Sequence, residues 1–305
     1  MDDARVSDLE RVIVDHSIDV LVPGCNDVSY EVCCQLANRL GYKGFETEAA
    51  LQSLDKKDKF RALCKGLKIS APVTYSGVET ALRAPGKLIV KPVDSYSGKG
   101  TSIIEAPSRK ALDKALALAL KESKLGGVVI EDYVEGQLYS YSAFLGDGKV
   151  TTAFNVIEYG PVNPFVVDTS YVLDHHVLES SLQQCAETLA SALEVRQGLL
   201  HLQYIAQGDD FWLIEPARRC PGDLYSELIN RATGYPYAHA YIAAFTGTAV
   251  PRKAPGPREY TVRHTLASRQ AGTLDFIDFA NVSALSGWYP IAPAGMPLAP
   301  SPGGR

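Results

Sequence analysis

The sequence HLQYIAQGDDFWLIEPARR, residues 201–219, has the pattern of a β-hairpin. Two apolar segments flank Gly208 to Asp210, which we take as a three-residue loop. In that register Gln203 lies directly opposite Glu215, with the two Cβ atoms about 5 Å apart. An amide oxygen and a carboxylate at one place suit a hard cation such as Mg²⁺ that bridges nucleotide phosphates. The alternative is that Gln203 and Glu215 form only a hydrogen-bonded pair at a sheet edge.

The two faces of this hairpin differ in composition. His201 and Ala217 share the face of Gln203 and Glu215, one period further along the strands. His201 is therefore either a histidine that supports a neighbouring ligand residue or a contact to substrate. The opposite face is expected to belong to the core and consists of Leu200, Leu202, Tyr204, Trp212 and Ile214.

Two arginines follow the hairpin directly. Arg218 and Arg219 precede the segment 220–223, after which a helix is expected. An arginine beside a metal-binding carboxylate is well placed to stabilise a transferring phosphoryl group or a substrate carboxylate. Adjacent side chains point in different directions, so we expect one of the two to face the site. Gly222 and Asp223 are further candidates for contact with substrate.

A lysine and a glycine-containing loop occur upstream. Lys91 lies near the end of the apolar segment 87–93, and residues 94–100 read DSYSGKG. A lysine at a strand end can hold phosphate oxygens, and a loop of small residues can close over a nucleotide through its backbone N–H groups. The loop is not a Walker motif, because Gly-x-x-x-x-Gly-Lys-Ser/Thr is absent. The alternative is a mobile hairpin with a solvated lysine.

Three blocks of sequence thus occur in one order. They are LIVKP (88–92) with its glycine loop, VIEDYVEG (129–136) and the hairpin 201–219. This arrangement resembles the ATP-grasp superfamily of carboxylate–amine ligases, in its carbamoyl-phosphate synthetase and dipeptide ligase branch, over residues 54–247. The resemblance implies an α/β fold of mixed helix and sheet. A shortened N-terminal Rossmann-like domain, a small lid lobe and a larger central lobe are expected, with ATP between the two lobes.

The resemblance implies nucleotide-binding roles for residues at matching positions. Lys91 resembles the lysine that contacts ATP phosphates. One of Lys56 and Lys57 resembles an earlier ATP lysine, and alignment from Phe60 favours Lys57. The loop positions expected to close over the phosphates are Ser95, Ser97, Gly98 and Gly100. The hinge positions expected to contact the nucleoside are Glu131, Asp132, Tyr133, Val134 and Glu135.

The resemblance also implies the metal-binding and catalytic residues. Glu215 resembles the main Mg²⁺ ligand, and Gln203 stands at the position of a second ligand. Arg219 resembles the arginine that stabilises an acyl-phosphate, with Arg218 beside it. ATP and Mg²⁺ are the implied cofactors, and Mn²⁺ is expected to be able to substitute.

The chain departs from the family's pattern at three positions. Gln203 stands where the family often has glutamate, although a glutamine occurs there in the carbamoyl-phosphate synthetase branch. Ala217 replaces an asparagine that would supply a further metal ligand. Leu138 lies where a ribose-binding carboxylate is expected, and Glu135 is the expected replacement.

Length and composition exclude several classes of protein. The chain has 305 residues and a formal net charge of −5, with a mass of 33.0 kDa and a pI near 5.7. An acidic chain is not expected to bind nucleic acid, and no apolar segment reaches the roughly 18–20 residues that cross a bilayer. The N-terminus is acidic where a signal peptide would be basic, and the six cysteines include no Cys-x-x-Cys pair. A cytoplasmic location is therefore expected.

The order of predicted elements divides the chain into four parts. The first is expected to begin with a capping box at residues 7–10 and to contain a buried strand at residues 18–22. The four expected parts are an N-terminal α/β domain (1–52), the lid lobe (53–135), the central lobe (136–250) and a β-rich extension with a Pro/Gly-rich tail (251–305).

The implied activity is phosphoryl transfer followed by amide formation. ATP phosphorylates a substrate carboxylate, and an amine then displaces phosphate from the acyl-phosphate. The expected partners are a small carboxylic acid and an amine, with a homodimer as a further candidate. Two alternatives remain open. Gln203 favours a short carbamoyl-phosphate-synthetase-like enzyme acting on bicarbonate or carbamate, whereas Ala217 and Leu138 favour a nucleotide-binding module without catalysis.

Overall fold

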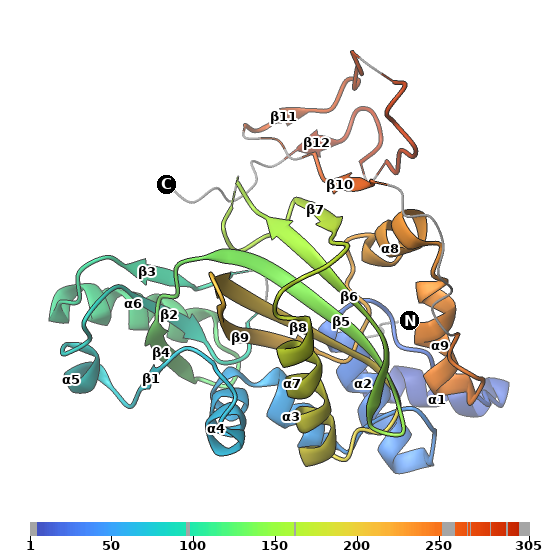
Figure 1. Cartoon of the computed structure of the whole chain (residues 1–305), viewed down its shortest axis with the longest axis horizontal. Coiled ribbons are helices and arrows are strands. Elements are labelled where there is room, and N and C mark those ends of the chain that lie inside the picture. The colour runs from blue at the N-terminus through green and yellow to red at the C-terminus, as the bar shows by residue number, and fades with distance from the viewer. Residues whose placement is uncertain are drawn as a thin grey trace.

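The computed structural model of the chain describes residues 5–95, 98–161, 163–251, 260–266, 268, 270–280, 282–290 and 292–298. Two antiparallel sheets dominate it, with a helical N-terminal segment below them and the C-terminal segment above (Figure 1). Within the described residues, no helix has both the length and the apolar character needed to cross a membrane.

The N-terminal segment is helical in its described part. Its helices are α1 (Val6–His16), α2 (Asp27–Leu40), α3 (Glu48–Asp55) and α4 (Lys57–Leu67). Asn26 caps α2, since its side chain accepts a hydrogen bond from the Ser29 backbone N–H at 2.9 Å. The expected capping box at residues 7–10 was wrong, because α1 begins at Val6 after Arg5, whose side chain makes no cap bond.

The buried strand expected at residues 18–22 was also wrong. The segment is not a strand, and Ile18, Val20 and Val22 are exposed. Only Leu21 is buried, in a small core with α1 and α2. An apolar segment becomes a strand only where another strand pairs with it, and the described N-terminal residues provide none.

The small lobe is a four-stranded sheet covered by a helix on one face. Its strands are β1 (Thr74–Tyr75), β2 (Leu88–Pro92), β3 (Ser102–Ile104) and β4 (Val128–Asp132), in the order β1-β4-β2-β3. Helix α6 (Arg109–Glu122) packs on Leu88 and Val90 of β2, and the short helix α5 (Val78–Ala81) lies at the edge. Because side chains alternate along a strand, Ile89 and Lys91 point to the other face.

The central lobe is built on a six-stranded sheet. Its strands are β5 (Gln137–Gly146), β6 (Lys149–Tyr159), β7 (Thr169–Val172), β8 (Gly198–Gln207), β9 (Asp210–Ala217) and β10 (Val262–His264), in the order β10-β7-β6-β5-β8-β9. Helix α7 (Glu179–Ala192) and α4 cover one face of the sheet. Helices α8 (Tyr225–Thr233) and α9 (Tyr237–Thr246) cover part of the other face.

The register of the β8–β9 hairpin confirms that Gln203 pairs with Glu215. The turn is shorter than expected, because Gln207 pairs with Asp210 rather than with Phe211. A β-bulge next to Gln203 adds one residue to β9 and restores the expected pairing further along.

This bulge also reverses the expected faces of part of β9. Leu213, rather than Trp212 and Ile214, is fully buried in the core. Ile214 instead lines the cavity described below. The one-residue shift changes which side chains face the core because the side-chain period of a strand is two.

The C-terminal segment has few strands in its described part. β10 extends the central sheet by pairing with β7, and β11 (Gly272–Thr273) pairs with β12 (Pro297–Leu298). Arg231 of α8 holds this segment by donating hydrogen bonds to the Ser286 carbonyl at 2.9 Å and the Tyr289 hydroxyl at 3.0 Å. The β-rich extension expected from the sequence is thus represented by short strands among the described residues.

Candidate functional site

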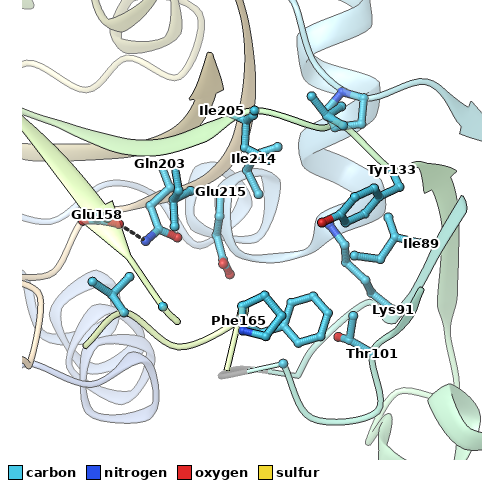
Figure 2. A pocket seen from close by; sticks show the side chains of 18 of the residues that line it. Ile89, Lys91, Thr101, Tyr133, Glu158, Phe165, Gln203, Ile205, Ile214 and Glu215 are labelled. Atoms are coloured by element: carbon cyan, nitrogen blue, oxygen red, sulfur yellow. Dashed lines mark hydrogen bonds between the residues drawn. The ribbon is translucent and has the colours of Figure 1, made fainter. Parts of the chain in front are cut away.

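A cavity of about 650 Å³ lies between the two sheets (Figure 2). Ile89, Lys91 and Tyr133 of the small lobe form one wall. The facing wall comes from β8 and β9 and contains Gln203, Ile205, Ile214 and Glu215. The loop before β7 completes the cavity with Pro161, Pro164, Phe165 and Val167. A cavity of this size, apolar with a few polar groups, is typical of a small-molecule site.

Lys57 reaches this cavity and Lys56 does not line it. Nζ of Lys57 donates to the Ser95 carbonyl oxygen at 2.7 Å and lies 3.7 Å from Glu215 Oε1. Lys56 is the non-helical residue between α3 and α4, and its Nζ lies 4.0 Å from Glu31 Oε1. The sequence left open whether Lys56 or Lys57 would contact ATP, and this geometry favours Lys57.

Lys91 is held in the cavity by a buried ion cluster. Its Nζ lies 2.9 Å from Glu131 Oε2, and Arg61 Nε lies 2.8 Å from Glu131 Oε1. Burial lowers the pKa of Lys91, and the Glu131 carboxylate opposes that effect. The same two cations lower the pKa of Glu131 in spite of its burial.

Glu131 differs from its expected role. Its side chain is fully buried and does not line the cavity, so it holds Lys91 rather than reaching a nucleotide. Arg61, which the sequence analysis missed, completes this cluster. Its position one helical turn after Lys57 on α4 was the available signal, because residues four apart share a helix face.

The rest of the hinge is divided between the cavity and the surface. Asp132, Tyr133 and Val134 line the cavity. Glu135 does not line it and forms an exposed ion pair with Lys87, at 2.8 Å between Nζ and Oε1. The expected replacement of a ribose-binding carboxylate by Glu135 is therefore not supported by its placement.

The glycine loop contacts the cavity through Ser95 and Gly98. The hydroxyl of Ser95 donates to the Lys99 carbonyl at 2.8 Å, which closes the loop on itself. Gly98 has a φ of 70° and packs against Phe165, because a Cβ built at Gly98 would overlap the Cβ of Phe165. Gly100 packs instead against Pro92 and Glu122, away from the cavity lining. Ser97 lies outside the described residues.

A third polar residue, Glu158 of β6, also lines the cavity beside Gln203 and Glu215. Gln203 Nε2 donates to Glu158 Oε2 at 2.9 Å. Burial raises the pKa of Glu158 to about 7, and the Asp223 charge adds to this, while hydrogen bonds from Ser140 and Gln203 oppose it. The sequence did not reveal Glu158, because β5 separates β6 from β8 in the sheet.

Arg218 and Arg219 point in different directions, as expected of neighbours. Arg218 is buried: its Nε donates to Glu46 Oε2 at 3.1 Å and its other nitrogens donate to the carbonyls of Leu199 and Gln197. It therefore ties the N-terminal segment to β8. Arg219 is paired with Asp27 at the start of α2. Neither arginine lines the cavity, so the catalytic roles expected of them stay predictions.

The three predicted substrate residues, His201, Gly222 and Asp223, do not line the cavity. His201 is buried, and its Nδ1 lies 2.7 Å from the Ser142 hydroxyl. Burial lowers the pKa of His201 to about 3, so its ring is neutral at physiological pH. Asp223 lies 3.1 Å from Arg263 of β10, and Gly222 packs against Cys25. The burial of His201 favours the first of its two alternatives, a histidine that supports a neighbouring ligand residue, over contact with substrate.

The donor set fits one hard cation and one polyanion. The described residues contain no group of three or more His, Cys, Asp or Glu that could hold a metal ion. Gln203 and Glu215 offer two oxygen donors at the cavity, a number that suits Mg²⁺ when phosphate oxygens and water supply the rest. Lys57 and Lys91 bring two positive charges to the same cavity, as a phosphate chain requires.

No family model matches the chain. A curated relative, formate-dependent phosphoribosylglycinamide formyltransferase of Cupriavidus pinatubonensis, is 29% identical over 182 residues, which is 55% of this chain and 43% of the relative. The chain thus spans less than half the length of this relative.

Solved structures resemble the chain along most of its length. The L-amino acid ligase of Bacillus licheniformis matches with a TM-score of 0.77 and 17% identity, covering 99% of this chain and 76% of that one. The phosphoribosylglycinamide synthetase of Anaerococcus prevotii matches with a TM-score of 0.72 and 15% identity, covering 97% and 77%. The biotin carboxylase domain of 2-oxoglutarate carboxylase from Hydrogenobacter thermophilus, described as a dimer with MgADP and bicarbonate, has a TM-score of 0.75 and 14% identity, covering 97% and 70%. At these identities the likeness establishes a common fold.

Proposed function

We propose that this chain, which has the ATP-grasp fold that its sequence motifs predict, is an ATP- and Mg²⁺-dependent ligase that joins a small carboxylic acid to an amine. One observation carries the proposal. A single cavity brings together Gln203, Glu215, Lys57 and Lys91, with Lys57 Nζ 3.7 Å from Glu215 Oε1. Oxygen donors and lysines in one cavity are the arrangement that a metal-bound nucleoside triphosphate requires.

The cavity lining offers groups for both parts of a nucleotide. Its apolar side chains, among them Ile89, Leu138, Ile205 and Ile214, would suit an adenine ring. Lys57, Lys91 and Glu215 would serve the triphosphate and its cation. Ser95 and Gly98 would provide backbone N–H groups for phosphate oxygens.

The proposed reaction has two displacements. A carboxylate oxygen of the acid attacks the γ-phosphorus of ATP, and the bond to the bridging oxygen breaks to release ADP. The nitrogen of the amine then attacks the acyl carbon, phosphate leaves, and the nitrogen loses a proton to solvent. Bound Mg²⁺ would neutralise phosphate charge and orient the triphosphate.

The residues of the chain would act by position and charge. Lys57 and Lys91 would hold phosphate oxygens, and the Glu131–Arg61 pair would keep Lys91 directed at the cavity. Gln203 and Glu215 would hold the cation. Arg219 would stabilise the acyl-phosphate, after separation from Asp27. No side chain is needed as a covalent nucleophile.

The replacement Glu215→Gln tests this proposal. It removes the charged cation ligand without changing the shape of the side chain, so ADP formation should be lost while the fold is retained. Glu79→Gln is the matched control, because Glu79 is exposed and paired with Arg109. Unchanged ADP formation in Glu215→Gln would reject the proposed site.

The identity of the substrates requires a product screen. Purified protein with ATP and Mg²⁺ is incubated with a panel of amino acids, small acids and amines, and amides are detected by mass spectrometry. ADP release that depends on bicarbonate alone would favour a carbamoyl-phosphate-synthetase-like activity, which Gln203 supports. Nucleotide binding without turnover by any acid would favour a module without catalysis, which Ala217 and the Arg219–Asp27 pair support.

A further inference from the structure

The side-chain amide of Gln203 has two chemically different ends. Its oxygen can bind a cation, whereas its NH₂ group is a donor and cannot. A glutamine is therefore a cation ligand only if its surroundings select the orientation in which the oxygen faces the cation. A glutamate at this position would not need such selection.

The surroundings of Gln203 select one orientation. Its Nε2 donates to Glu158 Oε2 at 2.9 Å, and the pairing in the hairpin sets Glu215 beside it. Figure 2 shows the amide nitrogen turned to Glu158 and the amide oxygen on the side of Glu215. The reversed amide would place its oxygen against Glu158, so that two acceptors would face each other.

Glu158 is itself held in place. It is 4% exposed and lies on β6 at the end of the cavity. Gln137 donates to its backbone carbonyl at 2.7 Å, which fixes the strand at this residue. A buried acceptor fixed in this way can select an amide orientation more strongly than a mobile surface carboxylate.

We propose that Glu158 is a positioning residue that turns the amide oxygen of Gln203 toward Glu215 and so makes a glutamine serve as a cation ligand. This inference rests on the proposed function, because it concerns the same cation site. Glu158 is not itself a ligand in the proposal. Its carboxylate acts through the hydrogen bond to Gln203.

A double-mutant cycle at positions 158 and 203 distinguishes a positioning role of Glu158 from a simple effect of its negative charge. The probe is Mn²⁺, whose binding in the presence of ADP is followed by electron paramagnetic resonance. Glu158→Gln should weaken Mn²⁺ binding about ten-fold, because the new amide no longer selects the orientation of Gln203. In a Gln203→Glu background the same Glu158→Gln change should leave Mn²⁺ binding equal or stronger, since the amide at 158 can then donate to the carboxylate at 203.

The alternative explanation makes the opposite prediction. If Glu158 only attracts the cation by its negative charge, Glu158→Gln weakens Mn²⁺ binding equally in both backgrounds, and the proposal is overturned. An unchanged affinity in the Gln203 background overturns it as well. The far-UV circular dichroism and the affinity for ADP without metal serve as controls for folding. Should Glu158→Gln fail to fold, Glu158→Asp keeps the charge and alters only the contact to Gln203: weaker Mn²⁺ binding would support the positioning role, and an unchanged affinity would overturn it.

The experiment also separates this inference from the proposed function. Failure of the unaltered protein to bind Mn²⁺ with ADP would reject the cation site as a whole. Binding by the unaltered protein, with no dependence of the Glu158→Gln effect on the residue at 203, would reject only the positioning role.

Discussion

The guanidinium of Arg219 binds both oxygens of the Asp27 carboxylate, with Nε 2.5 Å from Oδ1 and Nη2 3.0 Å from Oδ2. Asp27 is the first residue of α2, so this pair connects the end of β9 to the N-terminal segment. The two side chains are 23% and 17% exposed. An action of Arg219 on a phosphoryl group therefore requires that the arginine leave Asp27.

Arg219 and Asp27 should have different effects on turnover. Arg219→Ala should lower kcat by on the order of 100-fold or more, equivalent to roughly 3 kcal/mol, because a charge-stabilising donor is lost. Asp27→Asn should leave kcat close to that of the unaltered protein and lower the free energy of unfolding by about 2 kcal/mol, since a hydrogen-bonded charge pair is weakened. Steady-state ADP release and urea unfolding measure the two quantities. Equal losses of kcat in both variants would show that the pair is structural only.

The neighbouring lysines 56 and 57 offer a matched comparison of nucleotide binding. Lys57→Ala should weaken MgADP binding about ten-fold or more, because a charge-assisted contact at the cavity is removed. Lys56→Ala should change the affinity by less than about two-fold, since Lys56 does not line the cavity and its Nζ lies 4.0 Å from Glu31 Oε1 instead. Isothermal titration calorimetry measures both. A larger effect of Lys56→Ala would exchange the assignment of the two residues.

The Arg61–Glu131–Lys91 cluster should dominate the stability of the small lobe. Glu131→Gln leaves two buried cations without a countercharge and should lower the free energy of unfolding by about 3–5 kcal/mol. Glu135→Gln is the control, because its ion pair with Lys87 is exposed and should contribute less than about 1 kcal/mol. Urea unfolding followed by circular dichroism compares them. Similar small losses in both would contradict the role given to the buried cluster.

Local patterns in the sequence predicted the parts of the site that depend on one or two adjacent strands. The apolar segment at residues 87–93 predicted a strand that ends near Lys91, and the hairpin pattern brought Gln203 to Glu215. The second prediction was correct although the expected loop was one residue too long, because the bulge in β9 compensates for the shorter turn.

The contacts that the sequence did not predict join elements that are distant in the chain. Glu158 reaches Gln203 across β5, and Arg61 of α4 reaches Glu131 of the small sheet. Residue spacing carries no information on which strand lies beside which. The expected strand at residues 18–22 failed for a related reason, since its apolar residues have no partner strand among the described residues.

The contact between Gly98 and Phe165 should be required for nucleotide binding. Gly98→Ala places a methyl group against Phe165 and should weaken MgADP binding about ten-fold, because overpacking displaces the loop from the cavity. Gly126→Ala is the control: its φ of 70° equals that of Gly98, but a Cβ there meets no atom within 4 Å. It should reduce stability by about 1 kcal/mol and leave the affinity unchanged. Equal affinities of the two variants would show that the contact has no role in binding.

The pH dependence of stability should reveal the partly buried carboxyl of Asp55 at the end of α3. Burial raises the pKa of Asp55 from 3.8 to about 7, and the neighbouring Asp27 adds to the shift. Between these two values the unfolded chain loses the proton that the folded chain retains. The contribution of Asp55 to stability is therefore present at low pH and is lost as the pH rises through about 7.

Asp55→Asn removes this titration. The difference in the free energy of unfolding, Asp55→Asn minus the unaltered protein, should rise between acid and neutral pH. The rise should be at most about 4 kcal/mol, and solvent screening of the carboxyl reduces it. Asp58→Asn, three residues further along, changes an exposed carboxylate and serves as the control for the substitution itself. Urea unfolding across this pH range measures the difference. Parallel curves for Asp55→Asn would mean that Asp55 is ionised at neutral pH in the folded chain, and therefore that Lys56 or solvent compensates for its burial.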